Sequence, residues 1–195
     1  MALALRSLPK SASSTRDRLI RAGVYFFQTQ GYHGTGIAAI LARAGTVRGS
    51  FYHHFPEGKE QLAVASLGWL EGEVTQYLDG LAASGSGSKE MVEGIARHAA
   101  QGIRSGERRR GSLLAALAQD AAPDSPRIAR ALKQYAGAVR HRLAAARDRE
   151  RPNEDGSVFA DQALAMVQGA SVLARVDGDA DRTIDIVTGW LCGQR

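Results

Sequence analysis

Apolar positions recur along this chain at intervals of three and four residues, and no segment alternates apolar and polar residues over the length of a strand. This pattern predicts an all-α fold with about nine helices. The first is expected to be capped by Ser14 or Thr15 and to end at Gly31. Two short helices follow, and the later helices are expected near residues 58–81, 89–103, 112–121, 125–149, 156–175 and 180–192.

The two short helices lie in residues 31–62, GYHGTGIAAILARAGTVRGSFYHHFPEGKEQL. Thr35 is expected to cap the first of them, and Gly45 supplies the turn between them. This is the arrangement of a helix-turn-helix, which presents the side chains of its second helix to the major groove of DNA.

The second short helix has two distinct faces. Its apolar residues recur at i, i+4 and i+8, and we expect them to pin this helix to the first two: Val47, Phe51 and Phe55. Its other residues should point away from the core, with Arg48 on the flank: Thr46, Gly49, Tyr52 and His53. The outward face is therefore polar and rich in rings.

The charge of the chain supports a polyanionic partner for this segment. Residues 1–60 hold eight Lys and Arg side chains against three acidic ones, so the formal net charge of +5 is concentrated there. A basic module on a neutral body suits nucleic acid, although a solvated basic surface would give the same count. Residues 1–13 are expected to be a flexible basic arm.

Other features limit the classes of protein to which this chain can belong. Cys192 is the only cysteine, so no disulfide joins two parts of the chain. No apolar run has the length of a membrane span, and the start MALALRSLPK is too short in apolar residues for a signal peptide. We therefore expect a cytoplasmic protein with no membrane partner.

The sequence gives little support to an enzyme. GTGIAA at 34–39 matches a dinucleotide-binding fingerprint only loosely, and the preceding QTQGYH is not the buried strand which that motif needs. His53 and His54 are adjacent, which is not the spacing of metal ligands on a helix. No nucleophile motif is evident. We expect no cofactor, no metal and no catalytic residues.

The helix-turn-helix segment resembles the DNA-binding domain of TetR/AcrR-type transcriptional regulators. The resemblance rests on these residues: Phe27, Gly31, Tyr32, Thr35, Ile37, Ile40, Ala44, Gly45, Gly49, Tyr52, His54, Phe55, Lys59, Glu60 and Leu62. FPEGKEQL has one residue more before Lys59 than most members, and together with GSLLAALAQDA at 111–121 it resembles the LmrA/YxaF-like branch. One departure is that Thr46 precedes Val47, where the family usually has a small apolar residue followed by a hydroxyl residue.

The resemblance implies a two-part protein. Residues 14–57 would be the helix-turn-helix DNA-binding domain, and residues 58–195 the larger effector-binding and dimerisation domain. The implied partners are double-stranded operator DNA, a small lipophilic or aromatic effector and a second copy of the chain. The implied function is a ligand-responsive regulator, with repression as the expected effect. The alternative is a helical small-molecule-binding protein or enzyme with a vestigial helix-turn-helix.

The predicted DNA-binding residues divide by the contact each can make. Arg48 can bind guanine bidentately or touch only phosphate or solvent, and Gly49 lets the helix approach closely. His53 is placed to meet a base or solvent. Tyr52, His54, Lys59 and the cap residue Thr35 are candidates for phosphate contacts. Thr46 and Ser50 complete the set.

Two further sets are expected in the larger domain. Candidates for the lining of an effector cavity are Trp69, Tyr77, His98, Leu114, Leu117, Tyr135, Met166 and Gln168, for each of which ordinary core packing is the alternative. A stripe of small residues in the penultimate helix and larger residues in the last one are expected to form the homodimer interface: Ala160, Ala163, Val167, Ala170 and Ala174, with Ile184, Val187, Trp190 and Leu191.

Overall fold

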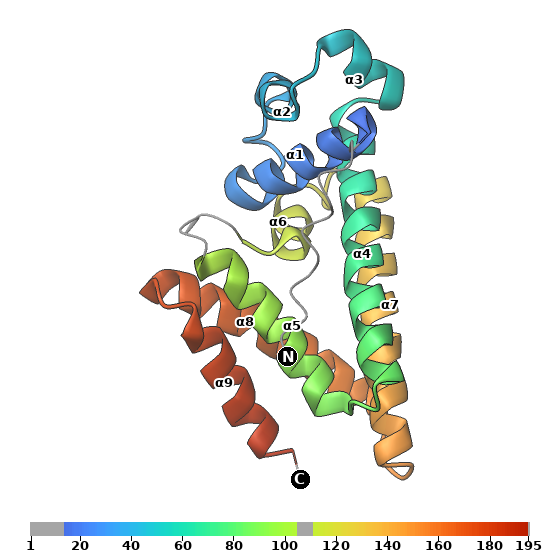
Figure 1. The fold of residues 1–195 in the computed structure, drawn as a ribbon, viewed down its shortest axis with the longest axis vertical. Helices are drawn as coiled ribbons and strands as arrows, with labels where there is room; N and C mark the ends of the chain where they lie inside the picture. Colours follow the sequence, from blue (N-terminus) through green and yellow to red (C-terminus); the bar gives the residue numbers. More distant parts are fainter. Residues whose placement is uncertain (1–13, 105–110, 195) are drawn as a thin grey trace. The chain divides into compact units, whose positions relative to one another are not determined.

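The computed structural model describes residues 14–104 and 111–194, and every element in those ranges is helical. The predicted basic arm at 1–13 and most of the loop at 104–111 lie outside the described residues. The helices are α1 (Thr15–Gln30), α2 (Ile37–Ala44), α3 (Arg48–His54), α4 (Lys59–Ala83), α5 (Ser88–Arg104), α6 (Leu113–Asp120), α7 (Pro126–Glu150), α8 (Gly156–Asp177) and α9 (Asp181–Cys192) (Figure 1). The predicted all-α class is confirmed for this part of the chain.

Local sequence explains where several helices begin and end. The Ser14 side chain accepts a hydrogen bond from the Asp17 amide at 3.1 Å, as predicted for the start of α1. Gly31 and Gly45 follow α1 and α2 with φ values of 72° and 60°, a region of backbone conformation that glycine enters without steric cost. These two glycines end their helices as expected.

Thr35 does not cap α2, and that prediction was wrong. The N-cap residue is Gly36, and α2 has no side-chain cap. The Thr35 hydroxyl instead donates to the Gly31 carbonyl at 2.6 Å, and the residue is only 1% exposed. Because the side chain turns back toward the end of α1, it closes the loop between the helices rather than starting the second one.

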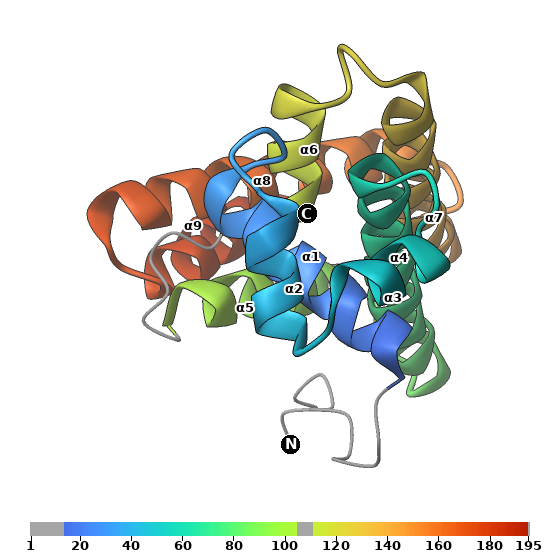
Figure 2. The same ribbon diagram turned by 90° about the horizontal axis from the view of Figure 1, so that it is seen from above.

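The described residues fall into two compact units, and the first comprises residues up to Leu70 together with Leu113–Tyr135. In this unit α1 lies between α6 on one side and α2 with α3 on the other (Figures 1 and 2). The largest side chains of its core are fully buried: Leu19, Phe27, Ile40, Phe51, Phe55, Leu62, Leu67, Leu113, Leu117 and Ile128.

The second unit comprises Glu71–Ser112 and the chain from Ala136 onward. Here α8 packs against both α5 and α9, and α5 packs against α9. Gly156, the first residue of α8, approaches α7 so closely that a Cβ atom on it would lie 2.5 Å from the Ala144 carbonyl oxygen. The Gly156 amide donates to the Asp148 carboxylate at 2.9 Å, which fixes this junction.

The boundary of the compact units differs from the predicted domain boundary. The sequence places a functional division between residues 57 and 58, whereas the first compact unit also contains the start of α4, α6 and the start of α7. The predicted division refers to function and stays a prediction. Across the described residues, no helix has both the length and the apolar character that crossing a membrane requires.

Candidate DNA-binding surface

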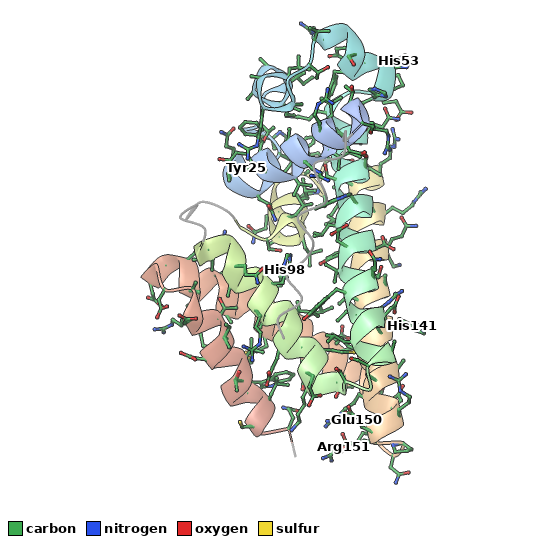
Figure 3. The ribbon with its side chains drawn as sticks, viewed as in Figure 1. Tyr25, His53, His98, His141, Glu150 and Arg151 are labelled. Atoms are coloured by element: carbon green, nitrogen blue, oxygen red, sulfur yellow. The ribbon has the colours of Figure 1, made fainter. Side chains whose placement is uncertain are left out.

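One face of α3 is exposed and carries four of the predicted DNA-binding residues. Arg48, Gly49, Tyr52 and His53 all lie on the surface, with Tyr52 37% exposed. His53 projects outward from α3 (Figure 3). Around Gly49 nothing lies within 4 Å of where a Cβ atom would be, so the helix backbone is open to a partner there. The guanidinium of Arg48 lies 5.7 Å from the centre of the Tyr52 ring.

The opposite face anchors this short helix. Phe51 and Phe55 are buried, and their ring centres are 5.8 Å apart. The Tyr52 ring meets the Phe51 ring edge-on at 5.1 Å. These two buried aromatic side chains hold α3 in one orientation, so the polar side chains of its exposed face are presented from a rigid base.

Val47 does not join that buried face, contrary to the sequence-based expectation. Its residue is 70% exposed. It is the N-cap of α3, with extended backbone angles of φ −107° and ψ 162°. Helical spacing of i, i+4 and i+8 applies only where all three residues are helical, and Val47 lies just before the first turn. The neighbouring Thr46 is half-buried, and its amide donates to the Leu41 carbonyl at 3.1 Å.

The Lys59 side chain forms hydrogen bonds within the first compact unit. Its ammonium group donates to the carbonyls of Tyr32 at 2.8 Å and Thr35 at 3.1 Å, and it lies 4.4 Å from the centre of the Tyr32 ring. Burial lowers the pKa of Lys59, against the opposing effect of the Asp120 charge. Burial also raises the pKa of Tyr32, with a further contribution from Glu60. The phosphate roles of Lys59 and Thr35 stay predictions, because the structure employs both side chains in holding the loop from 31 to 36.

The same loop is held from its other side by α6. The carboxylate of Asp120, the last residue of α6, accepts a hydrogen bond from the His33 amide at 2.9 Å. A Cβ atom on Gly31 would lie 2.7 Å from that carboxylate, so a larger residue would displace the Asp120 side chain, and the positive φ also favours glycine here. Lys59 and Asp120 therefore fix the entry to α2 together.

The turn between α3 and α4 and the first residues of α4 are bonded in a similar way to the start of α7. The Ser125 hydroxyl donates to Glu60 at 2.5 Å and accepts from the Ile128 amide at 3.1 Å. Arg127 forms an ion pair with Glu57. Glu57 lies in the FPEGK segment that is one residue longer than usual, so the longer turn supplies one partner of this contact.

The remaining predicted residues are less exposed. Ser50 and His54 are half-buried, and the ring centre of His54 lies 5.1 Å from that of His53. Sequence reasoning did not select Arg43, which lies exposed in the last turn of α2 with its guanidinium 3.4 Å from the centre of the Tyr25 ring. Its only signal was a basic residue next to the predicted turn.

Residues 19–65 match the family model described as bacterial regulatory proteins, tetR family. The match covers α2, α3 and the exposed face just described. This segment of the chain is therefore of the TetR type. The chain is 38% identical over 68 residues to the HTH-type transcriptional regulator LmrA of Bacillus subtilis, covering 35% of this chain and 36% of the relative. It is 35% identical over 85 residues to the regulator named YxaF of the same organism, covering 44% and 43%.

The chain thus aligns with less than half of the length of these two relatives, whose names are those of the branch indicated by the sequence. The likeness in fold extends over most of the chain. A TetR transcriptional regulator from Legionella pneumophila superposes with a TM-score of 0.84 over 94% of this chain and 98% of that one, at 20% sequence identity. At that identity the likeness establishes a shared fold.

The predicted effector-cavity residues are divided between the two compact units. Trp69, Leu114, Leu117 and Tyr135 belong to the first, and Tyr77, His98, Met166 and Gln168 to the second. Leu117 is fully buried in the core of the first unit, and Trp69 and Leu114 pack against that core. Their role as a ligand lining stays a prediction.

The predicted dimer stripe lies inside the chain. Ala160, Ala163, Val167, Ala170 and Ala174 are all buried, as are Val187 and Leu191. Their burial comes from the packing of α8 against α5 and α9 within one chain, so an isolated protomer offers little of this stripe to a partner. Ile184 and Trp190 are only partly buried.

An adjoining face of α8 and α9 is open, and two residues of the predicted interface, Ala170 and Trp190, lie along it. An apolar groove of about 780 Å³ runs along it and is lined by residues that include Met166, Gly169, Val172, Leu173, Ile186 and Trp190. Val172 and Leu173 are 45% and 46% exposed. Trp190 is held in place by stacking on Phe159, with ring centres 5.6 Å apart.

Proposed function

We propose that this TetR-type chain is a DNA-binding transcriptional regulator that inserts α3 into the major groove of operator DNA. The observation that carries the proposal is the exposed face of α3, with Arg48, Gly49, Tyr52 and His53 presented from a helix that Phe51 anchors in the core. Short recognition helices contact base edges chiefly through their first residues.

Three residues of this face have distinct roles in the proposal. Arg48, at the first position of α3, reads a guanine through its O6 and N7 atoms. Gly49 leaves the space for the backbone to approach the DNA. The Tyr52 hydroxyl donates to a phosphate, which sets the register of the protein on the duplex without specifying sequence.

A homodimer gives this contact its geometry. Two recognition helices must be about 34–36 Å apart to enter successive major grooves on one face of the duplex. We assign the dimer interface to the apolar groove of α8 and α9, which exposes Val172 and Leu173 in the single chain. A second copy would bury the same groove on both chains, as a two-fold interface requires.

An effector completes the proposal. A small lipophilic or aromatic molecule that binds better to a conformation with a different helix spacing would release the operator by shifting the population. A near-complete switch needs a difference in binding free energy of about 5 kcal/mol between the two conformations. Repression relieved by such a ligand is the regulatory effect we propose.

The test is a gel shift of the full chain with the DNA upstream of its own coding sequence. Arg48→Ala should cost about 1–3 kcal/mol and relax sequence preference. Tyr52→Phe should cost about 1 kcal/mol on every sequence because it removes one hydrogen bond. Lys133→Ala, which changes an exposed lysine on α7, is the matched control.

Normal binding by both variants would contradict the assignment of α3 as the recognition helix. The alternative, a small-molecule-binding protein or enzyme with a vestigial helix-turn-helix, predicts that no duplex shifts at any salt concentration. A protein that contacts phosphates must instead bind more weakly as salt rises.

A further inference from the structure

Val47 occupies a position where its residue type weakens the fold. It is the N-cap of α3, and no side chain accepts a hydrogen bond from the first amides of that helix. Ser, Thr, Asp and Asn are the favoured N-caps because their oxygens accept from those amides, and valine is among the poorest. An arrangement that is locally unfavourable is expected where the residue serves a partner rather than the fold.

The most exposed large apolar side chains described in the first compact unit lie together at this place. Among the described residues of that unit, the large hydrophobic side chains that stand exposed are Val47, at 70%, and Tyr52, at 37%. Both belong to α3 and its cap, next to Arg48. The isopropyl group of Val47 is therefore offered to whatever contacts the recognition helix.

The major groove has one feature that suits an isopropyl group. Thymine exposes its C5-methyl group in the major groove, whereas the other base edges there present hydrogen-bond donors and acceptors. We propose that Val47 is a specificity-determining residue that selects thymine by packing against its C5-methyl group. This assignment rests on the proposed DNA-binding function and adds a direct apolar contact to it.

The contact can be tested one methyl group at a time. The probe is the tightest-binding duplex recovered by selecting a random DNA library on the full chain, with each thymine then replaced singly by deoxyuridine. At one position in each half-site, the parent protein should lose about fourfold in affinity, the effect of removing one buried methyl group. Cytosine carries no such methyl group, so replacing that thymine–adenine pair by a cytosine–guanine pair should also weaken binding. Using 5-methylcytosine in place of the cytosine should then restore part of the lost affinity.

Variants at two neighbouring positions separate this contact from others. Val47→Ala should bind thymine and deoxyuridine duplexes equally, whereas Val47→Ile should keep the sensitivity of the parent. Arg48→Ala should bind more weakly yet still distinguish the two duplexes. Thermal unfolding followed by circular dichroism checks that each variant is folded.

The outcomes are distinct. The assignment would be overturned if no replacement of a thymine by deoxyuridine weakened binding. It would also be overturned if Val47→Ala lost as much affinity on that replacement as the parent does. Either result would leave the DNA-binding proposal intact. A selection that recovers no duplex would overturn both.

Discussion

Lys59 shows how one side chain can be fitted to two different roles. As a basic residue at the first position of α4, it suits a phosphate. In the structure it also bonds the carbonyls of Tyr32 and Thr35, and its pKa is lowered by burial. The two roles predict different effects on stability. Only the bonds to the two carbonyls exist in the DNA-free protein, so only they can contribute to its free energy of unfolding.

We expect Lys59→Ala to lower the free energy of unfolding by about 1–3 kcal/mol, because two partly buried carbonyls lose a charged donor. Urea unfolding of the DNA-free protein measures this. Lys133→Ala removes an exposed lysine of the same unit and should change stability by less than about 0.5 kcal/mol. If Lys59→Ala unfolds like the parent but binds DNA more weakly, the phosphate contact is its whole role.

Individual residues also show where sequence reasoning ends. The exposed face of α3 was predictable because Phe51 and Phe55 mark the buried side of the helix and leave the other side to solvent. The core position of Val47 and the cap role of Thr35 were predicted wrongly. Each lies in a connection just before a helix, where the backbone is not helical. Helical spacing therefore did not apply to Val47, and the start of α2 lies one residue beyond the cap position assigned to Thr35.

At the scale of elements, the end of α6 holds the loop between α1 and α2. Asp120 accepts from the His33 amide, and it lies 87 residues away in the sequence. Asp120→Ala removes this acceptor and should lower stability by about 1 kcal/mol. The local consequence is more specific, because the His33 amide should then exchange its hydrogen faster than in the parent.

Hydrogen exchange at residue resolution measures that change. Asp124→Ala is the matched control, because Asp124 is an exposed acidic residue of the same connection. Unchanged exchange at His33 in Asp120→Ala would show that the bond does not protect the loop.

Helix positions were the most predictable part of the fold. The start of α1 at Ser14 and the ends of α1 and α2 at Gly31 and Gly45 follow from capping chemistry that acts within four residues. The ties from Asp120 to His33 and from Ser125 to Glu60 were not foreseen. Nothing local marks them, because each joins residues that only the tertiary fold brings together.

At the scale of the whole molecule, the small residues of α8 illustrate the same limit. A stripe such as Ala160, Ala163 and Ala170 permits close helix approach, and it was expected to meet a second chain. The structure buries it within one chain, against neighbouring helices. Small residues specify close packing but not the partner, so the sequence could not distinguish a neighbouring helix from another protomer.

The open groove of α8 and α9 leads to a prediction for assembly. We expect Leu173→Arg to give monomers, because a homodimer through this groove would bury the added charge without a partner. A penalty of about 3 kcal/mol would raise the dissociation constant of the dimer about a hundredfold. The same variant should lose affinity for an operator with two half-sites, since each monomer then binds one groove alone.

Sedimentation velocity across a range of protein concentrations measures the dimer directly. Ala83→Arg adds the same charge at an exposed position at the end of α4, and it should leave the assembly unchanged. Leu173→Arg leaves the buried stripe of α8 untouched, so the fold of each chain should persist, as circular dichroism can verify. A Leu173→Arg protein that sediments as the parent dimer would place the interface elsewhere on the chain.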